Sequence, residues 1–469
     1  MNFPNFLKFP DDFSFGSSVS AFQVEGNSGE RKSDWDDFLE RHSNIISQNE
    51  KGPQWWEKGK AEADIDKLAD LGVKVQRLSF EWARIEPEKG KINEDAIQRY
   101  KEIIEHLHKK KIKPVVTLNH YVLPSWVAKR GAWENRKNIG AFERYVIMIV
   151  SRFPEVKTWL TLNEPSVLIE SGYLLPFFPP QRGSVFAAFR AHHNMMEAHK
   201  KAYLAIKGII PDSLISMAFS FRWYRPENPK DIFEKGYADL VNYFDSINYV
   251  DGVKDYLDFI GVNFYAGYYL NLNFSKIKFR LHGPESKPVK TILFGEVRKP
   301  GAYVSDLGAP IVPGFFLDLL QTLHIKFKKP IIITENGIAD SRDIHRPFYM
   351  LVHLVSLWKA IQQGIDIREY IAWSSVDNLE WLEGYSQEFG LIHIDAKSGK
   401  REIRKSAYMY KEIIQEGGIH IEKLLQKYFD EETREKAGEL IHHLLLKHGK
   451  NYDKNNFSID EIDIPFEKK

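Results

Sequence analysis

The chain has 469 residues, of which 43% are hydrophobic and 28% charged, so it can bury a large core and is neither disordered nor collagen-like. Lys and Arg together number 65 against 64 Asp and Glu, which gives no reason to expect a DNA or RNA partner. The absence of Cys excludes disulfides, thiol nucleophiles and Cys-ligated zinc.

The N-terminal sequence Met1-Asn2-Phe3-Pro4-Asn5 is not a basic start followed by an apolar run. The longest apolar stretches, such as residues 146–150, are too short to span a bilayer. We therefore expect a soluble, cytoplasmic protein without a membrane partner, and we leave open whether it forms a homo-oligomer.

Short apolar strands alternate along the chain with amphipathic helices. One predicted helix covers residues 62–71 and ends at Gly72, and another covers residues 95–108. Several strands are continuously apolar, as in Ile331-Ile332-Ile333, which is typical of a parallel sheet buried on both faces. Eight strands are predicted, at residues 13–16, 75–79, 114–118, 159–162, 214–218, 259–263, 330–334 and 370–374.

Eight strand–helix units favour an α/β fold of the (β/α)8 barrel type. The alternative is an open doubly wound sheet, but neither a Gly-x-Gly-x-x-Gly turn nor a P-loop occurs. Residues 222–257 and 270–310 are expected to be long irregular loops over a site. Apolar residues at helical spacing after Gly418 predict two further helices. We therefore divide the chain into a barrel, residues 1–418, and a helical extension with a tail, residues 419–469.

In such a barrel the site lies at the C-terminal ends of the strands. Six or more of the predicted strand ends carry amide, carboxyl, imidazole, guanidinium or aromatic side chains. These are Gln23, Glu25, Arg77, Glu81, Trp82, Asn119, His120, Tyr121, Asn163, Glu164, Asn263, Tyr265, Glu335, Asn336, Trp373, Asp377, Asn378, Glu380 and Trp381.

Each of these motifs also has a purely structural interpretation. Asn163 could cap a helix with Glu164 in its first turn. Asn336-Gly337 could form a hairpin turn, although the preceding strand is continuous rather than alternating. His120 could be a hydrogen-bonded core residue. The sequence has no His-Glu-x-x-His motif, so we expect no zinc site.

Glu164 and Glu335 each end a buried strand, on opposite sides of the predicted barrel. Two carboxyl groups that face each other across a pocket are what cleavage of a glycosidic bond requires. The neighbouring amides and His120 could bind sugar hydroxyls, and Trp373 and Trp381 could cover the apolar face of a sugar ring.

At these residues the sequence resembles glycoside hydrolase family 1, the β-glycosidases. The likeness extends from Phe13 to about Ile414, and residues 338–340 and Arg346-Pro347 are most similar to the archaeal branch. The matching segments are residues 13–18, Gln23, residues 25–26, 77–79, Trp82, residues 84–85, Pro87, His120, residues 123–124, Trp133, Asn135, residues 161–165, 258–265, 333–337, 373–374, 377–378 and 380–381.

The resemblance implies a retaining exo-β-glycosidase that hydrolyses unphosphorylated β-glucosides or β-galactosides without a cofactor or metal. It makes Glu335 the nucleophile and Glu164 the acid/base. The residues that it assigns to the substrate are Gln23, His120, Asn163, Trp373, Glu380 and Trp381, and the supporting residues are Arg77, Asn263 and Tyr265. It also implies a cis peptide bond between Trp373 and Ser374.

Two positions depart from the family pattern. The family usually has Trp where this chain has Tyr121, and Arg or Lys where it has Glu388. Both positions are expected to border the sugar, so they concern the choice of glycone. Two other functions are alternatives to hydrolysis. One is a catalytically silent sugar-binding barrel, which would be expected to lack one of the two glutamates. The other is a transglycosylase.

Overall fold

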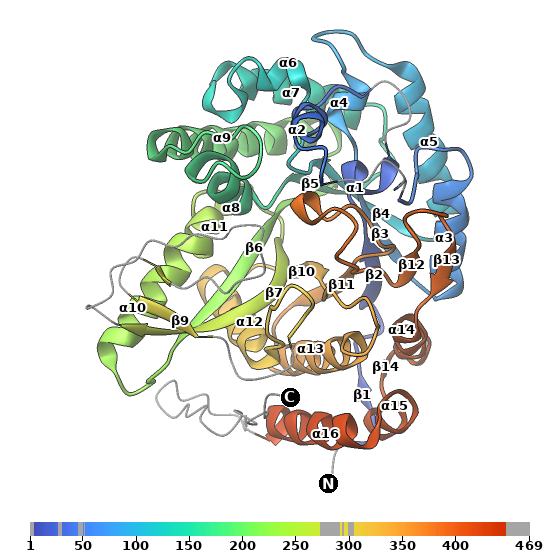
Figure 1. Cartoon of the computed structure of the whole chain (residues 1–469), viewed down its shortest axis with the longest axis vertical. Helices are drawn as coiled ribbons and strands as arrows, with labels where there is room; N and C mark the ends of the chain where they lie inside the picture. The colour runs from blue at the N-terminus through green and yellow to red at the C-terminus, as the bar shows by residue number, and fades with distance from the viewer. Residues whose placement is uncertain are drawn as a thin grey trace.

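Eight parallel strands form the centre of the computed structural model (Figure 1). The model describes residues 4–26, 31–45, 50, 52–272, 291–292, 295–298 and 304–446. The strands are β2 (Ser14–Ser18), β3 (Val75–Ser79), β4 (Lys113–Asn119), β5 (Thr158–Asn163), β6 (Leu214–Pro226), β7 (Ile260–Leu272), β10 (Ile331–Asn336) and β11 (Ile367–Trp373). Each pairs with the next, and β11 pairs with β2, so the sheet closes. The (β/α)8 barrel is confirmed, and the open sheet is wrong.

The continuous apolar strands fill the barrel interior with side chains. One buried cluster contains a residue from each of six barrel strands and Phe259, which directly precedes β7. Its members are Val75, Val115, Leu160, Ala218, Phe259, Ile332 and Ile371. A filled interior is the normal state of such a barrel, so ligands are confined to its ends. The main covering helices are α3 (Lys60–Asp70), α5 (Glu94–Lys109), α7 (Lys137–Val150), α9 (Val185–Ile209), α12 (Pro313–Phe327), α13 (Arg346–Gln362) and α14 (Lys405–Glu416).

Shorter elements connect these units. They are β1 (Leu7–Lys8), α1 (Ala21–Glu25), α2 (Asp34–Arg41), α4 (Trp82–Ile85), α6 (Ser125–Ala128), η1 (Ala132–Glu134), α8 (Pro165–Leu168), η2 (Ile169–Leu174), η4 (Lys254–Tyr256), η5 (Trp381–Glu383), β12 (Ile392–Ile394), β13 (Arg401–Ile403) and β14 (Gly418–Ile419). Of these, α1, α8 and η5 carry residues that matter at the site, because they follow β2, β5 and β11.

The prediction of irregular structure over residues 222–257 is wrong. Here β6 continues beyond the barrel to Pro226 as a ribbon with β7, and the chain then forms α10 (Ile232–Asn242), η3 (Tyr243–Ile247) and α11 (Asn248–Asp251). Strands β8 (Thr291–Ile292) and β9 (Gly295–Arg298) add to the edge of β7. Of the second predicted loop, residues 270–310, the parts at 273–290, 293–294 and 299–303 lie outside the described residues.

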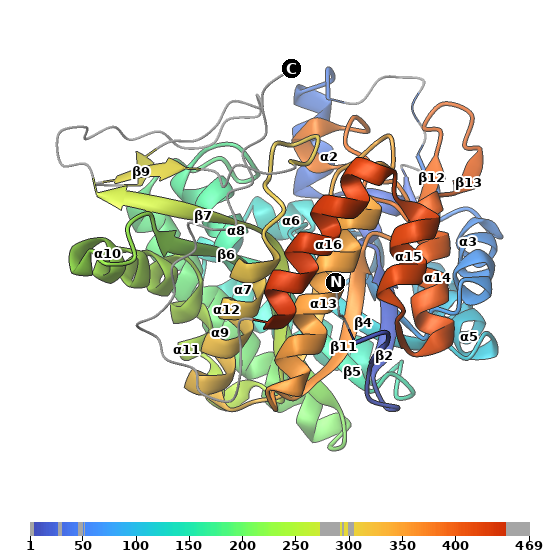
Figure 2. The ribbon, with the colours of Figure 1, turned by 90° about the horizontal axis from the view of Figure 1, so that it is seen from below.

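Two helices follow β14, which pairs with β1 near the start of the chain. They are α15 (Ile421–Tyr428) and α16 (Glu431–Leu446). Both lie on the outside of the barrel: α16 lies across α13, and α15 lies beside α14 (Figure 2). The Lys359 ammonium group of α13 donates to the Leu445 carbonyl at 3.3 Å and also to the Leu444 carbonyl. Its burial there lowers the pKa of Lys359 to about 8.

We propose that this extension stabilises the barrel without taking part in chemistry. Ile441 of α16 is 0% exposed, so Ile441→Ala should lower the free energy of unfolding by about 2–5 kcal/mol, the usual cost of such a cavity. Ile325→Ala, at a site 56% exposed on α12, is the matched control and should cost less than about 0.5 kcal/mol. Denaturant unfolding measures both, and equal stabilities would contradict the proposal.

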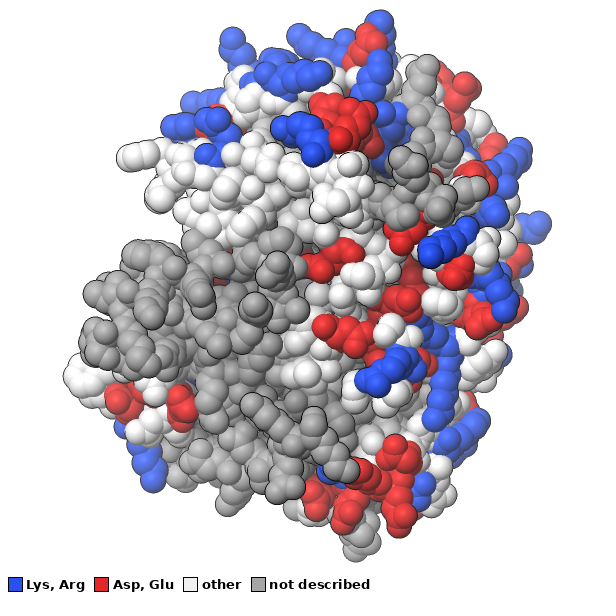
Figure 3. Space-filling view, in the orientation of Figure 1, with Lys and Arg blue, Asp and Glu red and all other residues white. Residues whose placement is uncertain are grey.

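The charged side chains on the surface are mixed in sign, as the nearly equal numbers of basic and acidic residues predict. Basic and acidic side chains lie next to one another on the described part of the face in Figure 3. Within the described ranges, no helix combines the length and apolar character needed to cross a membrane.

Candidate active site

A cavity of about 270 Å³ opens at the C-terminal ends of the barrel strands. It is lined by polar groups from several strand ends together with aromatic and aliphatic side chains. The lining residues are Gln23, His120, Tyr121, Asn163, Glu164, Val167, Phe178, Tyr265, Ser305, Leu307, Ala309, Glu335, Gly337, Ile338, Ala339, Tyr349, Trp373, Glu380, Trp381 and Phe389.

Glu335 is the penultimate residue of strand β10, and two side chains fix its carboxyl group. Arg77 of β3 donates to Oε1, and the Tyr265 hydroxyl of β7 donates to Oε2 at 2.6 Å. Arg77 is itself held in place by bonds to Thr117 Oγ1 at 3.1 Å and Asn163 Oδ1 at 2.6 Å. The adjacent guanidinium group stabilises negative charge on Glu335 in a pocket that excludes most water.

Glu164 directly follows β5, at the N-cap position of α8, with a left-handed backbone φ of 40°. Its side chain forms no cap bond. Instead, Oε1 accepts from Asn263 Nδ2 at 2.9 Å and Oε2 accepts from the Tyr121 hydroxyl. Burial, followed by the charge of Glu335, raises the pKa of Glu164 to about 7. The interpretation of Asn163 as a helix cap is therefore wrong: Asn163 is the last residue of β5, Glu164 occupies the cap position, and its side chain lines the pocket.

Hydrogen bonds define the orientation of Asn163 and the tautomer of His120. Asn163 Oδ1 accepts from Arg77, so its Nδ2 group faces His120 Nε2 at 3.2 Å and donates to it. Burial, followed by the charge of Arg77, lowers the pKa of His120 well below its usual range, so the ring is neutral and its proton is on Nδ1. Among the described residues this Nδ1 is buried and has no hydrogen-bond partner.

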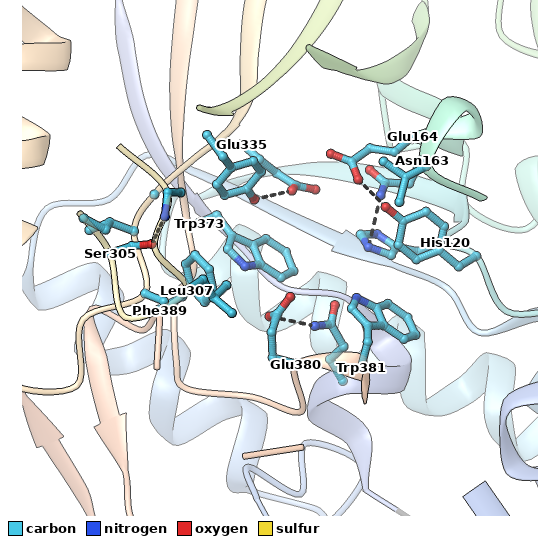
Figure 4. A pocket seen from close by; sticks show the side chains of 18 of the residues that line it. His120, Asn163, Glu164, Ser305, Leu307, Glu335, Trp373, Glu380, Trp381 and Phe389 are labelled. Carbon is cyan, nitrogen blue, oxygen red and sulfur yellow. Dashed lines mark hydrogen bonds between the residues drawn. The ribbon is translucent and has the colours of Figure 1, made fainter. Parts of the chain in front are cut away.

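Glu380 and Trp381 lie across the pocket from Glu335 and Glu164 (Figure 4), and Gln23 and Trp373 also line the pocket. Gln23 Nε2 donates to Glu380 Oε2 at 3.4 Å. Burial, followed by the charges of Glu335 and Glu164, raises the pKa of Glu380 to about 8. The peptide bond that follows Trp373 is cis, as expected.

Nine of the eleven residues assigned from the sequence line the cavity, and Arg77 and Asn263 lie behind them as hydrogen-bond donors. The sequence did not identify Phe178, Leu307 or Phe389 as lining residues. Only their aromatic or aliphatic character in the long segments that follow β5, β7 and β11 could have indicated them. The alternatives of a hairpin at residues 334–337 and a core His120 are wrong, because β10 is parallel to both of its neighbours and His120 lines the cavity.

Glu388 does not line the cavity, contrary to expectation. Its carboxylate pairs with Arg404 and lies 3.2 Å from His393 Nδ1. Glu388, His393 and Asp377 bring three possible metal-ligand atoms within 4.8 Å of one another. Arg404 donates to both carboxylates, however, and so supplies the positive charge that a metal ion would provide. We assign no metal to this cluster.

Two buried carboxyl groups in one pocket, one paired with a guanidinium and the other with a raised pKa, meet the requirement for cleaving a glycosidic bond. On this barrel they define a glycoside hydrolase.

Comparison with known proteins gives the family. The model of glycosyl hydrolase family 1 matches residues 6–235 and 245–419, and the chain belongs to that family.

The alignments with three similar proteins extend over almost the whole length of those proteins. β-Glucosidase A of Thermotoga maritima is 30% identical over 88% of this chain and 99% of its own. The β-galactosidase of Sulfolobus acidocaldarius is 29% identical over 88% and 96%, and the 6-phospho-β-galactosidase of Clostridium acetobutylicum 28% over 86% and 96%. A solved structure of β-glucosidase from T. maritima in complex with glucoimidazole superposes with a TM-score of 0.78, at 27% identity over 88% of this chain and 100% of that one.

Proposed function

We propose that this protein is a retaining exo-β-glycosidase acting on unphosphorylated β-D-glucosides and β-D-galactosides. The observation that carries the proposal is the contrast between the two glutamates: Glu335 is ion-paired with Arg77, whereas the pKa of Glu164 is raised to about 7. In this assignment one carboxyl group is an anion and the other still holds a proton near neutral pH, as acid-assisted displacement requires.

In the first half-reaction, Glu335 attacks the anomeric carbon while Glu164 protonates the departing oxygen. Esterification removes the charge of Glu335, so Glu164 loses part of what raised its pKa and can then act as a base toward water. Asn163 would hold the sugar 2-hydroxyl, where hydrogen bonds strengthen in the transition state. This mechanism calls for a carboxyl separation of roughly 5–5.5 Å, whereas an inverting enzyme needs about 6.5–9.5 Å.

The remaining residues support binding of a neutral sugar. His120, Gln23 and Glu380 offer hydrogen bonds to hydroxyls, and Trp373 and Trp381 offer flat apolar faces. Because burial and two neighbouring carboxyl groups raise the pKa of Glu380, this side of the pocket already disfavours negative charge. The negative charge of a sugar 6-phosphate would be disfavoured by the same burial and the same carboxyl groups.

A panel of 4-nitrophenyl β-glycosides tests substrate class and chemistry together. We expect kcat/KM for the glucoside or galactoside to exceed that for the 6-phospho-galactoside by about 100-fold or more, the scale of a like-charge contact. Comparable turnover of the phosphorylated substrate would contradict the proposed glycone. No turnover of any member would favour the silent sugar-binding alternative, and products transferred to added alcohols would identify a transglycosylase.

A further inference from the structure

We propose that Tyr121 is a positioning residue for proton transfer: its hydroxyl group holds Glu164 Oε2 and keeps the ionised form of that carboxyl group accessible. The inference rests on the proposed function, because it assigns the proton transfers to Glu164. The proposed role is particular to this chain, because Tyr121 occupies a position at which family 1 enzymes usually have Trp.

The position of the Tyr121 hydroxyl is set by its backbone and by packing. Tyr121 follows β4 with a left-handed φ of 69°, a conformation that a bulky residue adopts only where its surroundings enforce it. Its ring, which is 4% exposed, meets Trp381 edge-on at 5.1 Å and His120 at 5.1 Å, with Phe178 at 6.1 Å. The ring therefore has little freedom to turn its hydroxyl away from Glu164.

Opposing influences act on the Glu164 proton. Burial and the charge of Glu335 favour the neutral acid, while the donors Tyr121 and Asn263, one on each oxygen, favour the anion. Arg77 also favours the anion. The other titratable groups that face this part of the pocket are Glu335 on β10, Tyr265 on β7, His120 after β4 and Glu380 after β11.

A phenol suits both protonation states of Glu164. A hydroxyl group donates to a carboxylate and accepts from a carboxylic acid, whereas an indole N–H can only donate. Tyr121 itself does not supply the proton. Burial, with the charges of Glu164, Glu335 and Glu380, raises its pKa well above its usual range. Its role is thus to keep Glu164 able to lose and regain a proton in each cycle.

The test is Tyr121→Phe, which removes only the hydroxyl group. The alkaline limb of the kcat/KM profile reports the Glu164 pKa in the free enzyme. With an unactivated aryl β-glycoside, that limb should move to higher pH by about one unit, as expected for the loss of a hydrogen bond to a charged group. The matched control is Tyr410→Phe, which removes a buried hydroxyl that donates to the Gly16 carbonyl at 2.8 Å; its limb should not move.

A second readout does not depend on turnover. In protein labelled with ¹³C at Glu side-chain carboxyl carbons, the Glu164 signal is assigned by its loss in Glu164→Gln and titrated in both backgrounds. A higher pKa in Tyr121→Phe supports the inference, and an unchanged pKa overturns it. Wild-type protein without activity toward the panel would defeat the proposed function, while this titration would still decide whether Tyr121 controls the Glu164 proton.

Discussion

Glu335→Gln should abolish turnover of every β-glycoside in the panel. An amide cannot form the glycosyl ester, so we expect kcat to fall by about 10⁴–10⁶-fold, the range seen when other enzymes lose a nucleophile. The substitution keeps the size of the side chain, and Arg77 can still donate to the amide oxygen while the Tyr265 hydroxyl accepts from the amide N–H. Initial rates at saturating substrate measure the loss.

Glu369→Gln is the matched control. Glu369 is also buried and ion-paired, with Lys113, but it lies near the start of β11, at the end of the barrel remote from the cavity. We expect it to retain near wild-type kcat. Activity in Glu335→Gln protein that is free of wild-type contamination would remove Glu335 from the mechanism.

Glu164→Gln should separate substrates by their leaving groups. A general acid contributes about 10²–10⁴-fold, and only where the departing oxygen needs a proton. Formation of the glycosyl-enzyme from a 2,4-dinitrophenyl glycoside should therefore be nearly unaffected, whereas cleavage of a phenyl or alkyl glycoside should fall by that factor. Pre-steady-state release of the phenol measures this step separately from the later attack of water.

The same variant also loses the base for the second step. We expect a rapid release of one equivalent of dinitrophenol, followed by slow turnover. The glycosyl ester forms quickly in this variant but hydrolyses slowly. Equal losses with all leaving groups would show that Glu164 does not act as the proton donor.

Much of the fold was predictable because its strands are buried on both faces. Short apolar segments, several of them continuous as in Ile331-Ile332-Ile333, located all eight strands to within a few residues, except where β6 and β7 run on beyond the barrel. Those extensions, at Ser220–Pro226 and Phe264–Leu272, mix polar and aromatic residues and lack the continuous pattern. Helix α10 was missed for a related reason: its apolar residues do not lie on one face, since Ala238 and Val241 are buried whereas Ile232, Phe233 and Leu240 are exposed.

The site was predictable where chemistry and topology coincide. Glu164 and Glu335 could be paired because parallel barrel strands bring their C-terminal ends together. The contact from Tyr121 to Glu164 was not predictable, because it depends on a left-handed backbone at one residue that neither pattern nor propensity reveals. The pairing of Glu388 with Arg404 likewise depends on two segments that meet only in the folded chain.

The stereochemistry of hydrolysis distinguishes a covalent intermediate on Glu335 from a single displacement by water. Proton NMR during the first minutes, before mutarotation, identifies the anomer released from an aryl β-glycoside. We expect the β-anomer, because Glu335 inverts the anomeric centre once and water, directed by Glu164, inverts it again. Initial appearance of the α-anomer would mean a single displacement by water, and would contradict the assignment of Glu335 as the nucleophile.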